Sequence, residues 1–282
     1  MAPSRPEAPA PGGVVGPGRL KLRTLPGPAA LGRVAAEHFV RAARVAIAER
    51  GRFRVALAGG STPRTLYRAL ARPDLARRVA WRRVEVFWGD ERAVARDHAD
   101  SNYRMVAETL LQHVDLPPDH VHPMPVECPD LDEAARTYQA EMAHIFGVAA
   151  TEPPPSLDLV LLGLGTDGHT ASLFPRSPAL RCAREWVLPS DPPVSGPARL
   201  TLTLPILNQA ARVLFLVSGG AKAEVLRRVL EEPAEPESLP AQGVVPVSGE
   251  LLYLVDDAAA SRLQGARSDC TQGPHAQWEW RP

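Results

Sequence analysis

The sequence predicts an α/β fold, an open, mostly parallel twisted sheet with helices on both faces. Six or seven short apolar runs, each long enough for a strand, alternate with segments whose apolar residues recur at helical spacing. Four of these runs pass directly into small or charged residues. Because right-handed crossovers bring the carboxyl ends of parallel strands to one edge of a sheet, we expect these four turns to meet there and form the functional site.

The amino-acid composition narrows the classes of ligand and site that the chain can have. The chain has 282 residues, 45% of them hydrophobic, and its 32 Lys and Arg balance 32 Asp and Glu. This balance favours a small-molecule ligand over nucleic acid or a membrane surface. Three widely spaced cysteines without histidines at metal-binding spacing argue against a disulfide framework or a zinc site. We expect a cytoplasmic monomer without signal peptide or membrane span, with one domain over 19–264 between a disordered Pro/Gly-rich tail, 1–18, and a polar tail, 265–282.

Each predicted element depends on the spacing of its apolar residues. Runs such as Val213–Val217 are apolar at every position, which is typical of a strand buried on both faces. Leu131, Ala135, Tyr138 and Met142 recur instead at helical spacing. The elements expected in order are strand 19–25, helix 29–50, strand 53–58, helix 63–71, strand 84–88, helix 102–113, helix 131–146, strand 157–162, strand 181–188, strand 199–203, helix 205–210, strand 213–217, helix 223–230, strand 251–255 and helix 256–262.

The turn Gly59–Arg64 has the features of an anion cradle. It joins a strand to a helix whose first turn suits Pro63, with Ser61 or Thr62 as its cap. Free amides, the positive end of a helix dipole and two hydroxyls would favour a phosphate there. An ordinary capped helix after a tight turn is the alternative. The turn is neither a Walker A loop nor the dinucleotide fingerprint, which argues against a nucleotide.

Charged residues follow the next strand, and a loop is expected there. Burying Asp90, Glu91 and Arg92 without partners would be costly. Arg92 suits a phosphate or carboxylate and Asp90 a polar contact or a base, whereas a salt-bridged surface loop is the alternative. Asn102 is expected either to help cap the following helix or to face the ligand.

His120 and His122 lie in a proline-rich connection, 117–129. Their spacing would allow a metal, but no cysteine or further histidine accompanies them, so we favour ordinary loop histidines.

The main candidate site follows the apolar run 157–162. The chain breaks there into a turn with Gly165 and Gly168, whose backbone amides can come close to a ligand. The same turn offers Asp167 and His169, a carboxylate and an imidazole two residues apart. Such a turn is where an open α/β sheet places its site. A turn with a solvated Asp and a capping His is the alternative.

Lys222 is one of only two lysines in the chain, and it follows the strand 213–217 in a Ser-Gly-Gly-Ala-Lys turn. A lysine in the first turn of a helix opposes the helix dipole, and a bound anion would remove that mismatch. We therefore expect Lys222 to contact a ligand.

Together these motifs resemble the 6-phosphogluconolactonase family, within the glucosamine/galactosamine-6-phosphate isomerase superfamily, over residues 20–263. The segments that carry the resemblance are ALAGGSTPRTLY, VFWGDERAV with SNYRM, LLGLGTDGHTASLFP, RLTLTLPILNQA and SGGAKAEVL. The resemblance implies a Rossmann-like domain that hydrolyses 6-phosphoglucono-1,5-lactone to 6-phosphogluconate in the pentose phosphate pathway. It also implies that no metal or organic cofactor is needed.

The resemblance further implies roles for individual residues. His169 would take a proton from the water that attacks the lactone carbonyl, and Asp167 would orient it. The amides of Gly165 and Gly168 are candidates for stabilising the oxyanion. The substrate phosphate would lie among Gly60, Ser61, Arg92 and Lys222, with Arg64 as a less favoured candidate.

Two alternatives remain open. Glucosamine-6-phosphate deaminase resembles this chain in fold and in the Asp-Gly-His turn, but it has Asn-Glu-Pro where this chain has Leu173-Phe174-Pro175. Phe174 cannot supply the carboxylate that partners the deaminase histidine, although Asp90 matches the deaminase's proton-shuttling base. A sugar-phosphate-binding regulator without turnover is the other alternative, and residues 1–18 are too short and proline-rich for the DNA-binding segment such proteins append.

Overall fold

The computed structural model describes residues 20–193, 195–264 and 278–279. Among them a seven-stranded sheet has the order β10-β1-β9-β8-β5-β2-β3, in which β10 runs antiparallel to β1 and the other neighbours are parallel. Its strands are β1 Leu20–Leu25, β2 Phe53–Leu57, β3 Val84–Trp88, β5 Leu159–Leu162, β8 Arg212–Val217, β9 Glu250–Asp256 and β10 Trp278–Glu279. The predicted parallel sheet is confirmed.

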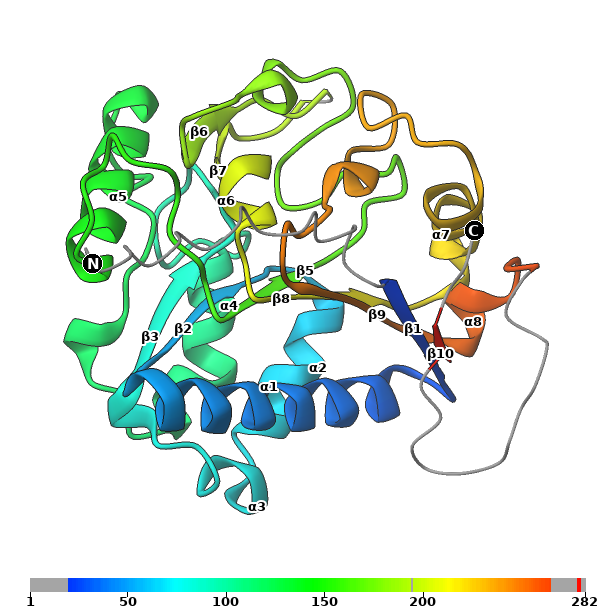
Figure 1. Cartoon of the computed structure of the whole chain (residues 1–282), viewed down its shortest axis with the longest axis horizontal. Helices are drawn as coiled ribbons and strands as arrows, with labels where there is room; N and C mark the ends of the chain where they lie inside the picture. The colour runs from blue at the N-terminus through cyan, green and yellow to red at the C-terminus, as the bar shows by residue number, and fades with distance from the viewer. Residues whose placement is uncertain (1–19, 194, 265–277, 280–282) are drawn as a thin grey trace, which may run out of the picture.

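Helices cover both faces of this sheet, as predicted. Figure 1 shows α1, α2 and α3 on one side and α5, α6 and α7 on the other. The helices are α1 Pro28–Arg50, α2 Ser61–Leu70, α3 Pro73–Ala76, α4 Asn102–Thr109, α5 Leu131–Phe146, α6 Leu204–Asn208, α7 Ala223–Glu231 and α8 Asp257–Ala260. None of the described helices combines the length and apolarity that crossing a bilayer requires.

Local chemistry sets the ends of the helices. The helix predicted over 131–146 is confirmed at both ends, because Asp130 accepts hydrogen bonds from the amides of Asp132 and Glu133, and Gly147 closes the helix at a φ of 70°. The predicted cap of α2 is wrong: the helix starts at Ser61 after Gly60, and no side chain caps it. The helix expected to reach His113 ends at Thr109, before a 3-10 turn.

A second, antiparallel sheet was not predicted. It has the order β4-β7-β6, with β4 Asp90–Arg92, β7 Arg199–Leu202 and β6 Val187–Ser190. The expected loop after β3 is therefore wrong, because Asp90 and Arg92 pair in register with Thr201 and Arg199. The strand expected over 181–188 is displaced to Val187–Ser190, so the two ranges share only Val187 and Leu188.

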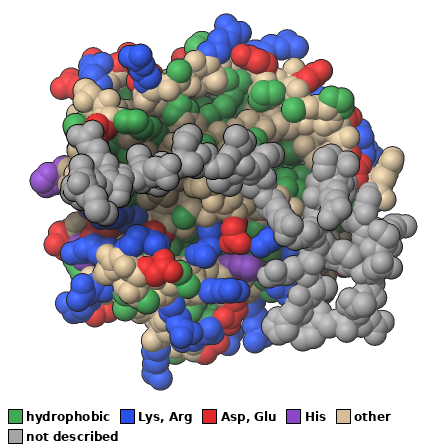
Figure 2. Space-filling model, viewed as in Figure 1, with side chains coloured by type: hydrophobic (Ala, Val, Ile, Leu, Met, Phe, Trp, Pro, Cys, Tyr) green, Lys and Arg blue, Asp and Glu red, His purple; other side chains and the backbone are tan. Residues whose placement is uncertain are grey.

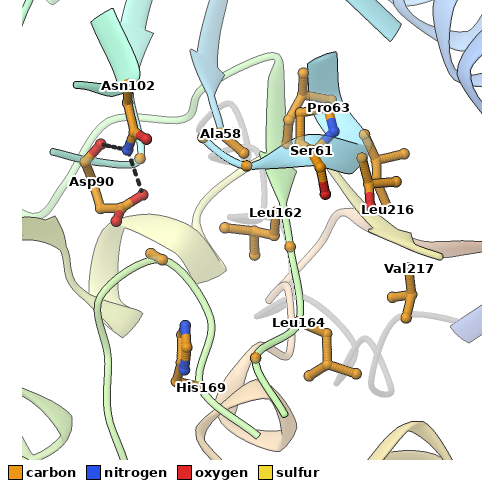
Figure 3. Close-up of a pocket in the computed structure, with 18 of the residues that line it drawn as sticks. Ala58, Ser61, Pro63, Asp90, Asn102, Leu162, Leu164, His169, Leu216 and Val217 are labelled. Atoms are coloured by element: carbon orange, nitrogen blue, oxygen red, sulfur yellow. Dashed lines mark hydrogen bonds between the residues drawn. The ribbon is translucent and has the colours of Figure 1, made fainter. Parts of the chain in front are cut away.

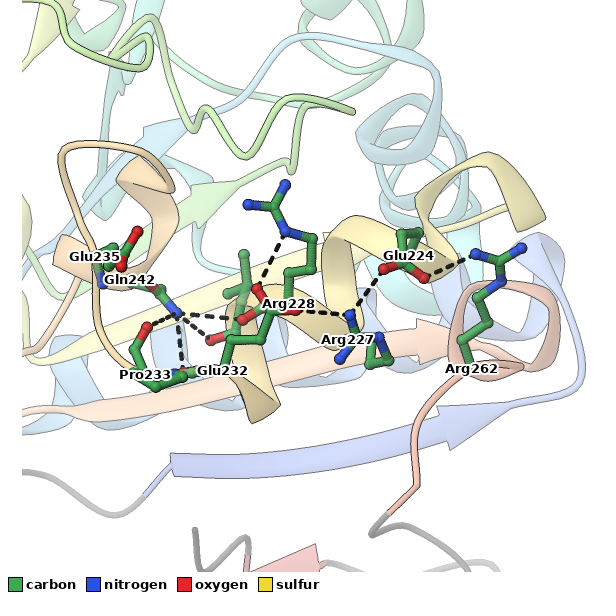
Figure 4. A network of polar contacts seen from close by, with 9 residues as sticks. Glu224, Arg227, Arg228, Glu232, Pro233, Glu235, Gln242 and Arg262 are labelled. Atoms are coloured by element: carbon green, nitrogen blue, oxygen red, sulfur yellow. Dashed lines mark hydrogen bonds and ion pairs between the residues drawn. The ribbon is translucent and has the colours of Figure 1, made fainter.

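The predicted tails, 1–18 and 265–282, lie outside the described residues except for β10. Within the described part, α7 is held at both ends by polar contacts (Figure 4). The Gln242 amide nitrogen lies 3.3–3.4 Å from four backbone carbonyls at the end of the helix. Near its start, Arg227 and Arg262 both bind Glu224, and their hydrogen bonds lower the pKa of Glu224 to about 2. These contacts fix the helix that follows Lys222.

Candidate active site

The four predicted turns meet at the carboxyl edge of the main sheet, around a pocket of about 270 Å³ (Figure 3). Of the predicted site residues, eight line this pocket: Gly60, Ser61, Asp90, Arg92, Asn102, Gly165, His169 and Lys222. The expectation that these turns would converge is therefore confirmed. In Figure 3 His169 lies across the space from Ser61, with Asp90 and Asn102 to one side.

The turn after β5 holds His169 against Asp167. The imidazole Nδ1 lies 2.6 Å from Asp167 Oδ1, and no described residue hydrogen-bonds to Nε2. An ionised carboxylate can only accept, so Nδ1 carries the proton and Nε2 has the lone pair. Gly165 makes this arrangement possible, because a Cβ there would come within 2.1 Å of Nδ1. The geometry leaves Nε2 free to accept a proton.

Asp167 is ionised in this setting. Burial by itself would raise its pKa, but the hydrogen bond and charge of His169 outweigh burial and lower it. The charge of Asp167 also acts on Lys222. Burial lowers the pKa of Lys222, and the Asp167 charge partly offsets this. His169 and Lys222 therefore line the pocket, whereas Asp167 does not line it and acts on both of them from behind.

The ring of Phe174 packs next to the imidazole of His169. Its ring centroid lies 4.9 Å from that of His169, at an interplanar angle of 56°. Its side chain offers no proton acceptor, so the hydrogen-bonded carboxylate beside His169 is Asp167. This contact supports the argument that the chain lacks the carboxylate relay of the deaminase at this position.

Asn102 faces the pocket and fixes β4. Its amide donates to the carbonyl oxygen of Asp90 at 2.9 Å, and its side chain occupies the space that a Cβ on Gly59 would need. The cap of α4 is Ser101 instead. Asp90 is 8% exposed and also accepts a hydrogen bond from Ser172 at 2.7 Å. The Asp90 carboxylate is thus held in one orientation at the pocket wall.

Two arginines form a like-charged pair at the pocket. Arg92 and Arg199 are direct partners across β4 and β7, and both line the cavity. Burial and the Arg92 charge lower the pKa of Arg199. Opposed like charges destabilise a sheet, so a bound anion would relieve the repulsion. Sequence reasoning missed Arg199, because its partner strand lies more than a hundred residues away in the chain.

The loop that carries Lys222 is anchored from β9. It forms a 3-10 turn, η5 Gly220–Lys222, directly before α7. The amide of Gly219 donates to both carboxylate oxygens of Asp256, at 3.0 and 3.1 Å, and Ser218 Oγ donates to the same group. Asp256 also caps α8 by accepting from the amide of Ala259. One buried carboxylate therefore positions the lysine turn.

Some predicted contacts do not form. Arg64 does not line the pocket but another cavity, with Arg68 and Arg72, because spacing of four residues places Arg64 and Arg68 on one face of α2. Gly168 does not line the pocket either. The amides of Gly165 and Gly168 already donate to backbone carbonyls, at 2.8 and 3.2 Å. Both are therefore poor oxyanion donors as the turn stands.

Residues 26–253 match the family described as glucosamine-6-phosphate isomerases/6-phosphogluconolactonase. This chain belongs to that family. A 6-phosphogluconolactonase from Synechocystis sp. is 45% identical over 219 residues, which are 78% of this chain and 88% of the relative. Another from Nostoc sp. is 40% identical over 218 residues, 77% of this chain and 88% of the relative.

Solved structures of the family have the same fold. The 6-phosphogluconolactonase from Trypanosoma cruzi aligns with a TM-score of 0.75 and 30% sequence identity. The alignment covers 87% of this chain and 97% of the other. The family description includes both a lactonase and an isomerase, so the site residues must separate the two.

Proposed function

We propose that the chain is a lactone hydrolase that converts 6-phospho-D-glucono-1,5-lactone to 6-phospho-D-gluconate, a step of the oxidative pentose phosphate pathway. The observation that carries the proposal is the His169–Asp167 pair, whose Nε2 is free in a pocket lined with cationic side chains. The lactonase relatives at 40–45% identity support the same reaction.

His169 acts as the general base. Nε2 takes a proton from a water molecule as its oxygen attacks the lactone carbonyl carbon, and the tetrahedral intermediate then expels the ring oxygen. The protonated imidazole returns the proton to that oxygen, so the histidine is regenerated. Asp167 holds the Nδ1–H tautomer and stabilises the imidazolium that forms between the two steps.

The phosphate positions the reacting ring. Ser61 begins α2, where free amides and the helix dipole favour an anion, and Gly60 precedes it at a φ of 96°. Lys222, Arg92 and Arg199 supply positive charge to the same pocket. Binding energy from this remote group holds the lactone carbonyl next to His169.

The test is acid release from freshly prepared 6-phosphogluconolactone, measured above the spontaneous rate. We expect the wild-type protein to accelerate hydrolysis and His169→Ala to abolish the acceleration while 6-phosphogluconate still binds. His144→Ala, which changes an exposed histidine on α5, is the matched control and should retain full activity. No acceleration by folded wild-type protein would refute the proposal. Ammonia release from glucosamine 6-phosphate would then indicate the deaminase, and binding without turnover a regulator.

The proposal includes a monomer that acts in the cytoplasm on a small molecule, without nucleic acid or membrane and without a metal or organic cofactor. The cationic side chains of Arg92, Arg199 and Lys222 in the pocket support a small anionic substrate. Light scattering after size exclusion should give a mass near 30.4 kDa. Activity that survives exhaustive dialysis against chelator would support a reaction without metal.

A further inference from the structure

A second cavity lies at the opposite edge of the main sheet. It has a volume of about 170 Å³ and opens between α1 and the first residues of β1, β5, β8 and β9. Since these strands are parallel, the candidate active site lies at their other ends. Figure 2 shows basic side chains, with acidic ones among them, over α1 on the face that Figure 1 shows. None of the residues of this cavity belongs to the site described above.

The cavity combines an apolar floor with a cationic rim. Its floor is made of Leu22, Ala42, Leu159, Val213, Leu214 and Leu252. Four cations, Lys21, Arg23, Arg41 and Arg212, line it together with His38 and a single carboxylate, Glu250. Such a combination of apolar surface and a few charged groups is typical of small-molecule sites.

Glu250 is already shared between two of these cations. Its Oε1 accepts from Lys21 Nζ at 3.0 Å and its Oε2 from Arg212 Nε at 3.2 Å. No described residue pairs with the exposed guanidinium of Arg41. The rim therefore keeps an excess of positive charge beside an apolar cavity, where an anion would be favoured.

The pKa of His38 reflects this excess of positive charge. His38 lies on α1 and lines the cavity. Burial and the charges of Arg23, Arg41 and Arg212 lower the pKa of His38 to about 4, although Glu250 acts in the opposite direction. An anion next to these groups would favour the protonated imidazole. His38 thus provides a local probe of binding.

We propose that this cavity is a second ligand site, which takes a small organic anion with a phosphate, sulfate or carboxylate head and a short apolar body. The head binds Arg41 and Arg212 at the rim, and the body covers the leucines of the floor. At ~30 Å³ per water molecule, the cavity holds roughly five or six waters, which limits the ligand to a small molecule. The proposal does not depend on the reaction at the other edge.

Butanesulfonate and sulfate are suitable probes, because both remain ionised throughout the titration of a histidine. NMR of the imidazole nitrogens of the full chain at pH 5.5 follows His38, whose signals are assigned by their absence in His38→Gln. We expect butanesulfonate to shift these signals saturably and to protonate part of the His38 population. Butanesulfonate should bind at least fivefold more tightly than sulfate, since sulfate lacks the apolar body.

Arg41→Ala should weaken butanesulfonate binding about tenfold. Arg44→Ala is the matched control, because it removes the same charge from an exposed position on α1 outside the cavity, and it should stay within twofold of wild type. Both side chains are exposed, so both variants are expected to fold. Absence of a saturable shift, equal binding of the two probes, or equal losses in the two variants would each overturn the proposal.

Discussion

His169 and His122 both lie within hydrogen-bond distance of carboxylates through their ring nitrogens, and their settings prepare them for opposite roles. Among the described residues the His169 ring contacts one carboxylate, that of Asp167 at 2.6 Å from Nδ1, and His169 lines the pocket with a third of its side chain exposed. His122 is buried and uses both nitrogens, with Glu141 at 2.9 Å and Glu85 at 3.0 Å. One carboxylate orients an imidazole and leaves a nitrogen free for proton transfer, whereas two carboxylates hold it in the charged form.

Burial and charge act in opposite directions on His122. Burial alone would lower its pKa, but the hydrogen bonds and charges of Glu141 and Glu85 outweigh burial and raise it to about 9. Its ring also stacks on Phe87, at a centroid distance of 4.8 Å. The expectation of an ordinary loop histidine is therefore incomplete, although no described group of three or more His, Cys, Asp or Glu could hold a metal. His122 joins β3 to α5.

The largest expected effect comes from His169→Gln. Loss of a general base lowers kcat roughly a thousandfold, which corresponds to about 4 kcal/mol of transition-state stabilisation. The free energy of unfolding should change by less than about 0.5 kcal/mol, as for a surface position. Steady-state kinetics and urea unfolding of the same preparation measure both quantities. A large loss of stability would show that His169 has a structural role like that of His122.

His122→Gln should give the reverse pattern. The substitution removes a charge between two carboxylates and leaves Glu85 only partly paired, so we expect a loss of about 3 kcal/mol in the free energy of unfolding. At a temperature where the variant is folded, kcat should stay within about threefold of wild type, since His122 does not line the pocket. His144→Ala, at an exposed histidine on α5, is the control and should leave stability unchanged. Equal stability of His122→Gln and wild type would contradict this assignment.

The contrast between the two histidines also shows what the sequence can predict. The apolar runs predict the six parallel strands. The site could be predicted because a parallel sheet brings the four turns after its strands to one edge. The second sheet could not be predicted, because Asp90–Arg92 is too short to show any periodicity. For the same reason Arg199 was missed: nothing local indicates that Arg92 is its partner.

A local sequence pattern does not show contacts between residues that lie far apart in the chain. The two carboxylates of His122 come from β3 and α5, so its spacing from His120 gave no indication of the network. Arg64 was misplaced for a different reason, since its distance from Ser61 along the chain says little about which face of α2 it occupies. The proposed oxyanion donors could not be judged from the sequence either. Only the folded turn shows that the amides of Gly165 and Gly168 already donate to backbone carbonyls.

Stability should depend on pH through His122. The pKa is 6.5 for an ordinary histidine and about 9 in the fold, so folding favours the protonated form. This contribution is fully present below pH 6.5 and is lost as pH rises through 9. We expect the free energy of unfolding to fall by roughly 2 kcal/mol over this range, less than the full linkage because Glu141 is partly exposed. Urea titrations at several pH values test this, and a decline of the same size in His122→Gln would assign it to other groups.

Asp167→Asn tests the role of the one carboxylate that contacts His169, and its expected effect on kcat is smaller than that of His169→Gln. An amide can donate to Nδ1 and so favour the tautomer with the proton on Nε2, which cannot act as a base. Because Asp167 is 40% exposed, water can substitute for part of its role, and we expect kcat to fall about tenfold. A fall in kcat with unchanged KM for 6-phosphogluconolactone would support an orienting role. A rise in KM alone would instead place Asp167 in substrate binding.

The smallest effect is expected from Asp256→Ala. This carboxylate contacts neither histidine, yet it anchors Ser218 and Gly219 ahead of Lys222. Without it the lysine turn is held less firmly, so KM should rise about fivefold while kcat stays within twofold, a change of about 1 kcal/mol. Asp257→Ala, at the next and exposed position, controls for lost charge. If kcat fell instead, the turn would be acting on the His169–Asp167 pair through Lys222 rather than on the phosphate. Lys222 would then contribute to proton transfer by His169 and not only to binding of the phosphate.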